Sequence, residues 1–115
     1  MIDDPKKNSL DTFIKQISKR MDAGDAQAFF MLGHQHKFGG LGFSKNATLT
    51  FELYLQAAAI GSIEAHYAIA EAYSNGLGVK KDWKRATHHY NLAAMGGRKL
   101  QGIFLVLWNK IRSNR

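Results

Sequence analysis

Histidine is the residue type in this sequence most able to bind a metal ion. The sequence holds five histidines and no cysteine, which excludes disulfides and thiolate metal sites. His34 and His36 are two residues apart, and His88 and His89 are adjacent. On a helix, side chains that share a ligand lie three or four residues apart. These spacings favour structural histidines, so we expect no metal and no cofactor.

Residues for acid–base or phosphate chemistry are equally sparse. Glu64 and Glu71 are two helical turns apart and would share a helix face, but no nucleophile paired with a base accompanies them. Residues 76–81 have the glycines of a phosphate-binding loop, yet they lack a preceding strand and the Gly-Lys-Ser/Thr ending. We therefore expect a binding protein that is not an enzyme.

An internal repeat determines which elements position these residues. Residues 23–33 align with residues 60–70 at an offset of 37, which pairs Gly24 with Gly61. The offset falls to 36 after the first glycine-rich loop. Repeats of this length are typical of helical solenoids, in which each unit is a helical hairpin and stacking buries one continuous core.

Each repeat is predicted to fold as two helices. Asp25 and Ser62 are expected to cap the first helices, which end at glycine-rich turns, and Asn46 and Asp82 to cap the second helices. The second helices should run to about residues 60 and 96. The sequence thus predicts one all-α domain over residues 1–115 with six helices. Its parts are a cap helix at 9–22, repeats at 23–60 and 61–96, and a C-terminal cap helix at 98–112.

The second repeat carries a specific pattern of residue types. The pattern consists of Ala65, Ile69, Ala70, Tyr73, Gly76, Gly78, Val79, Asp82, Arg85, Ala86, His89, Tyr90, Ala93 and Ala94. It resembles the Sel-one-like repeat family, relatives of the tetratricopeptide repeats, and the first repeat resembles that family more weakly. The resemblance implies a short right-handed α-α solenoid with an adaptor function. It also places His36 and His89 at core aromatic positions.

The resemblance implies that the first helix of each repeat faces the concave side of the solenoid. Phe30 and Tyr67 would then be aromatic anchors for a protein partner. Alternatively, both rings pack between neighbouring helices. The expected concave residues are Gln27, Phe30, His34, Lys37, Glu64, Tyr67, Glu71 and Ser74.

The last predicted helix has more apolar residues than it needs to seal the second repeat. One face of it comprises Leu100, Ile103, Phe104, Leu107 and Trp108. Leu105 and Val106 lie off that face. The surplus indicates a partner, either another protein or a second copy of the chain as a homodimer. The alternative is a helix whose apolar residues are all used in the core.

Basic residues concentrate in the C-terminal third of the chain. Residues 1–79 carry a net charge of −1, and residues 80–115 carry +8. The basic patch comprises Lys80, Lys81, Lys84, Arg85, Arg98, Lys99, Lys110 and Arg112. This asymmetry indicates an acidic protein partner. The alternatives are nucleic-acid phosphates, as for a phage or mobile-element inhibitor of a host nucleic-acid-processing complex, and a solvated face that aids solubility.

Neither a secretory signal nor a membrane span is expected. The longest apolar run, residues 103–108, has six residues, and a membrane-spanning helix needs about 20. Together with the lack of cysteine, this favours a cytoplasmic protein that does not contact membranes. The sequence therefore predicts a protein–protein interaction module, either an adaptor or a small inhibitor or accessory subunit.

Overall fold

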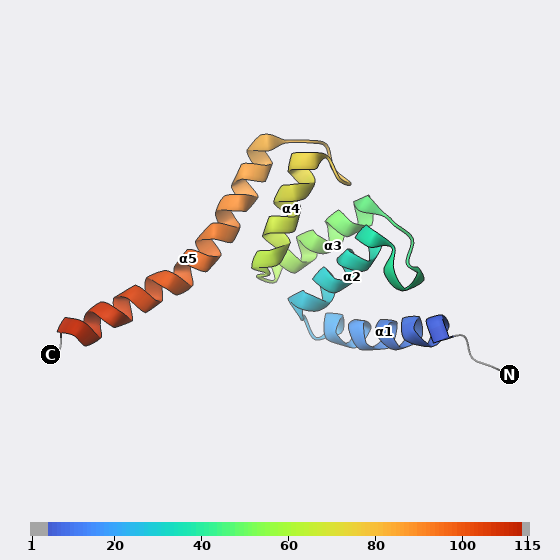
Figure 1. The fold of residues 1–115 in the computed structure, drawn as a ribbon, viewed down its shortest axis with the longest axis horizontal. Helices are drawn as coiled ribbons and strands as arrows, with labels where there is room; N and C mark the ends of the chain where they lie inside the picture. Colours follow the sequence, from blue (N-terminus) through green and yellow to red (C-terminus); the bar gives the residue numbers. More distant parts are fainter. Residues whose placement is uncertain (1–4, 114–115) are drawn as a thin grey trace.

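The protein folds into stacked helices joined by short turns (Figure 1). The computed structural model describes the backbone of residues 5–113 and the side chains of residues 9–96 and 110–113. Over these residues every regular element is helical, as the sequence predicts. The elements are α1 (Pro5–Asp22), α2 (Ala26–Phe38), the short 3-10 helix η1 (Gly40–Gly42), α3 (Ala47–Ala59), α4 (Ile63–Asn75) and α5 (Trp83–Ser113).

The four helices of the two repeats begin after the capping residues that the sequence predicts. The caps are Asp25, Asn46, Ser62 and Asp82, and each side chain accepts a hydrogen bond from a backbone amide two or three residues further on, at 3.0–3.1 Å. Such a cap satisfies an amide that has no partner within its helix and contributes about 1 kcal/mol. The repeat boundaries are therefore set locally by these polar residues.

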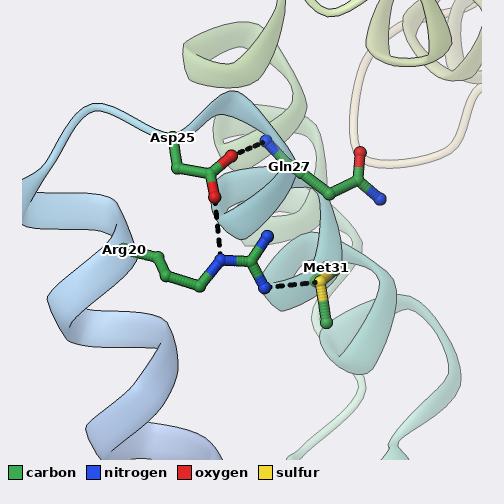
Figure 2. Close-up of polar contacts among 4 residues, drawn as sticks. All are labelled: Arg20, Asp25, Gln27 and Met31. Atoms are coloured by element: carbon green, nitrogen blue, oxygen red, sulfur yellow. Dashed lines mark hydrogen bonds and ion pairs between the residues drawn. The ribbon is translucent and has the colours of Figure 1, made fainter.

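The contact between α1 and the first repeat centres on Arg20 (Figure 2). Its Nε donates a hydrogen bond to Asp25 Oδ2 at 2.8 Å, and its Nη1 lies 3.5 Å from the sulfur of Met31 on α2. The hydrogen bond from Arg20 holds the pKa of the Asp25 carboxyl below its usual range. Since Ile17 is also buried, α1 packs on α2 as the expected N-terminal cap.

The main core lies where the two repeats meet. Here α3 packs against α4, while α2 pairs with α3 and α4 pairs with α5. The core cluster comprises Phe51, Tyr54, Ile69, Ala72, Tyr73 and Ala86. Its aromatic and aliphatic side chains come from three different helices, so each repeat completes the core of its neighbour, as stacking of solenoid units requires.

The C-terminal cap helix expected at 98–112 is not a separate element. Instead, α5 continues from Trp83 to Ser113 without the break predicted near Gly96. A Cβ at Gly96 would lie 2.9 Å from the Ile63 side chain, so this glycine allows α5 to pass close to the start of α4. Glycine inside a helix lowers helix stability by about 1 kcal/mol. The close packing of α5 on α4 offsets this cost, so Gly96 does not have to form a turn.

The long α5 gives the molecule an elongated shape. Its overall dimensions are 72 × 35 × 19 Å, and the C-terminal part of α5 extends away from the packed repeats (Figure 1). Among the described residues, no helix combines the length and apolarity needed to cross a bilayer.

Candidate partner-binding groove

A groove of about 440 Å³ opens between the two repeats. The end of α2, the start of α3 and the middle of α4 form its walls, and the loop after α4 closes one side. Its apolar surface comes from Phe38, Phe51, Tyr54 and Leu77. Phe38 and Leu77 are 57% and 45% exposed, so a partner that enters the groove would bury them. Apolar walls with a few polar groups are the usual composition of a binding pocket.

Charged residues stand at the rim of this groove. Lys37 Nζ lies 3.8 Å from Glu71 Oε2, which joins α2 to α4 across the opening. The same ammonium group lies 5.2 Å from the centre of the Phe38 ring. Lys45 adds a second cation, which is exposed. A partly exposed ion pair of this kind contributes less than about 1 kcal/mol, so it holds Lys37 only weakly.

Tyr54 contributes a buried ring to the groove wall. Burial, together with the negative charge of Glu71, raises its pKa to about 12. The phenol is therefore neutral at physiological pH and able to donate a hydrogen bond. The nearby Thr50 hydroxyl already has partners, since it lies 2.8 Å from the Asn46 carbonyl.

The pKa of Tyr54 predicts alkaline destabilisation that depends on this residue. An unfolded tyrosine loses its proton near pH 10.0, whereas folded Tyr54 keeps its proton up to about pH 12. The contribution of Tyr54 to the free energy of unfolding is therefore fully present below about pH 10 and is lost as the pH rises toward 12. Relative to Tyr54→Phe, the wild type should lose about 2 kcal/mol of unfolding free energy between about pH 9 and about pH 11.5 in urea titrations. Parallel losses in the two proteins would contradict this pKa.

The predicted concave residues divide into separate groups. Lys37 and Glu71 line the groove, whereas Gln27 and Glu64 border a second hollow of about 330 Å³ at the opposite end of α2 and α4. Tyr67 is 47% exposed, and its ring centre lies 6.1 Å from that of Tyr90 on α5. The predicted strip therefore includes residues of two separate hollows, one at each end of α2.

Three other predicted residues have packing contacts. Phe30 packs on the core cluster and stacks against Tyr54 with ring centres 5.1 Å apart, which corresponds to the packing alternative. His34 is exposed and lies edge-on to Phe38 at 4.6 Å. Ser74 is buried and donates a hydrogen bond to the Ala70 carbonyl at 2.9 Å. The structure thus removes Ser74 from the partner-binding strip, because its hydroxyl is turned into its own helix.

Phe38, Lys45 and Leu77 were not predicted as groove residues. Phe38 is the last residue of α2, and Leu77 stands between two turn glycines. Large apolar side chains beside glycine turns are the feature of the sequence that could have indicated them. A repeat alignment alone does not indicate Phe38 as a groove residue, because the equivalent position in the second repeat is Asn75.

Four residues of the basic patch lie at the start of α5 and in the loop just before it. Lys80, Lys81, Lys84 and Arg85 are all exposed. Trp83 lies among them with 63% of its surface exposed, and Lys81 Nζ is 6.0 Å from its ring centre. Trp83 was also missed, although it stands within this charged segment of the sequence.

Several predicted residues lie outside the described side chains. They are Arg98 and Lys99 of the basic patch, and Leu100, Ile103, Phe104, Leu107 and Trp108 of the apolar face. Lys110 and Arg112 are described and exposed near the end of α5. Their positions on α5 separate them from the basic residues at the start of the same helix.

The histidines form contacts that their spacing in the sequence did not indicate. His36 Nδ1 donates a hydrogen bond to the Ser44 carbonyl at 3.0 Å, and its ring packs on Phe43. His89 lies beside His66 of α4, with their Nδ1 atoms 3.2 Å apart. Burial lowers the pKa of both His66 and His89, and neighbouring histidine charge lowers them further.

The repeat pattern and the fold together identify the class of protein. The Sel1 repeat matches residues 26–62 and 63–97, so the chain belongs to the Sel1 repeat family. These bounds are close to those expected from the internal repeat. Sel1 repeats typically mediate protein–protein interactions and are generally non-catalytic binding modules.

Two solved structures and one curated protein are similar to this chain. The uropathogenic Escherichia coli protective antigen c5321, which displays an SLR fold, is 30% identical with a TM-score of 0.68, over 73% of this chain and 18% of its own. A Sel1 repeat protein from Oxalobacter formigenes is 27% identical with a TM-score of 0.65, over 71% and 33% of the respective chains. Chitin synthase regulatory factor 3 of Schizosaccharomyces pombe is 37% identical over 68 residues, which is 59% of this chain. The match spans only 7% of that regulatory factor.

Proposed function

We propose that this protein is a non-enzymatic adaptor, or a small inhibitory or accessory subunit, that binds an acidic segment of another protein. The groove between the repeats carries this proposal. It offers the exposed apolar side chains of Phe38 and Leu77 beside the cations of Lys37 and Lys45. The typical role of Sel1 repeats in protein–protein interaction supports the same function.

The proposed partner segment has an apolar side chain flanked by carboxylates. The apolar side chain would fill the groove against Phe38 and Leu77 and gain about 25 cal/mol for each Å² of apolar surface removed from water. A flanking carboxylate would pair with Lys37 or Lys45, and such charge complementarity contributes mainly to specificity and association rate. The neutral Tyr54 hydroxyl would donate to a polar group of the segment.

Affinity capture from the native cell extract tests the proposal. The bait is the wild-type protein, compared with a Phe38→Ala/Leu77→Ala variant whose exposed side chains can be shortened without emptying the core. The matched control, Ile60→Ala/Met95→Ala, removes two apolar side chains of similar exposure that do not line the groove. A partner held by the wild type and the control but lost by the groove variant is expected. Equal recovery by all three proteins would overturn the proposal.

Nucleic-acid binding is a second candidate because of Trp83. An exposed aromatic ring lies among Lys81, Lys84 and Arg85. This combination is typical of proteins that bind single-stranded nucleic acid, in which the ring stacks on a base and the cations contact phosphates. If this surface binds single strands, Trp83→Ala should lower the affinity for a labelled single-stranded oligonucleotide about tenfold, while Trp83→Phe should retain most of the affinity. Fluorescence anisotropy at low salt measures both variants. No wild-type binding at low salt would eliminate this candidate.

A further inference from the structure

Packing of α4 against α5 brings together two histidines that lie 23 residues apart in the sequence. The Nδ1 atoms of His66 and His89 are 3.2 Å apart, and the two rings are inclined by only 26° with centres separated by 5.4 Å. Both side chains are partly exposed, so a small solute can reach them. This histidine pair is not part of the groove.

We infer that His66 and His89 form a binding site for a divalent transition-metal ion, and that zinc fits its geometry. Zinc–nitrogen bonds are 2.0–2.1 Å long, so two nitrogens of one tetrahedral ion lie about 3.3–3.4 Å apart. The observed separation of 3.2 Å is close to this value. Binding therefore requires the two rings to rotate until both Nδ1 lone pairs converge on the ion, with little change in the distance between the two nitrogens.

Metal binding would change the tautomer of one ring of the pair. Imidazole binds a metal through a ring nitrogen that carries no proton. Without an ion, one Nδ1–H donates to the other Nδ1. With an ion, that proton moves to Nε2 of its own ring, and both Nδ1 lone pairs bind the metal. For two neutral rings the exchange releases no net proton.

Neighbouring side chains orient the pair and limit its affinity. The Tyr73 ring stacks on His89 with an inclination of 18° and a centre distance of 5.8 Å, which restrains the imidazole. In the described part of the chain, no group of three or more histidine, cysteine, aspartate or glutamate residues could hold a metal ion. Water would complete the coordination, and the nearby Arg85 over Tyr73 adds positive charge that opposes tight binding.

Calorimetric titration of tag-free protein with zinc chloride tests the inference. We expect one ion per chain. His66→Gln and His89→Gln should each lower the zinc affinity at least about tenfold, because even the loss of a residue that only orients a metal ligand lowers affinity by that factor. The matched control is His34→Gln, which removes an exposed histidine of α2 and should leave the affinity unchanged. The melting temperature of the wild type should rise with zinc concentration, because an ion that binds only the native state stabilises it.

A second readout uses the wild-type protein and does not depend on the folding of any variant. Nitrogen NMR of labelled histidine should show zinc-dependent shifts at Nδ1 of both His66 and His89. Shifts confined to other histidines, equal zinc affinity of the His66→Gln/His89→Gln variant, or no binding at millimolar zinc would each overturn the inference.

Discussion

Replacing Gly78 by alanine should lower the free energy of unfolding by about 3 kcal/mol or more. Gly78 has a φ of 74°, in the left-handed region that alanine disfavours, and a Cβ there would collide with the Ala47 carbonyl at the start of α3. A backbone atom cannot move away as a side chain can. The loop after α4 would therefore have to leave the first repeat, and with it the stacking of the two units.

Gly24→Ala is the matched control for this prediction. Gly24 has almost the same φ, 77°, but a Cβ there meets no atom within 4 Å. Its replacement should cost only the backbone strain, about 1 kcal/mol. Urea-induced unfolding of the three proteins measures both effects. Equal destabilisation by the two variants would show that the contact between Gly78 and Ala47 contributes nothing.

Reversal of charge at the groove should weaken binding of the captured partner about 100-fold at low salt. The variant Lys37→Glu/Lys45→Glu places like charges against the acidic segment, and like-charge contacts cost several kcal/mol. The loss should shrink as salt screens the charges. Surface plasmon resonance of the partner over a series of salt concentrations measures the effect.

The control for charge reversal is Lys15→Glu/Lys19→Glu on the exposed side of α1. It changes the net charge of the protein by the same amount but leaves the groove intact. Its affinity for the partner should stay within about twofold of the wild type. If both variants weaken binding equally, the overall charge of the protein and not the groove determines the affinity.

Local features of the sequence sufficed to predict most of the helices. Polar caps such as Asp25 and Ser62 act within a few residues of themselves, so their position in the sequence specifies where a helix begins. Gly96 shows where this logic fails. The same residue type serves as a turn at Gly39, with a φ of 71°, and as a close helix contact at Gly96, and only the packing against Ile63 distinguishes the two.

The candidate sites were harder to predict because they combine distant residues. The groove joins Phe38 of α2, Tyr54 of α3 and Leu77 beyond α4, and no spacing along the chain indicates that these side chains meet. Similarly, the spacing rule compared His88 with His89, whereas the close partner of His89 is His66 on another helix. The register of α4 on α5 determines that pair, and it follows from side-chain packing between the helices.

Site-specific photo-cross-linking from the groove is the most direct test of the account. A photoreactive phenylalanine analogue replaces Leu77 in one protein and Leu55 in another. Both positions are exposed to a similar extent, but only Leu77 lines the groove. We predict that irradiation in the native extract links the partner to position 77 through an apolar residue flanked by carboxylates, and leaves position 55 unlinked. A partner that cross-links at position 55 and not at position 77 would contradict binding in the groove.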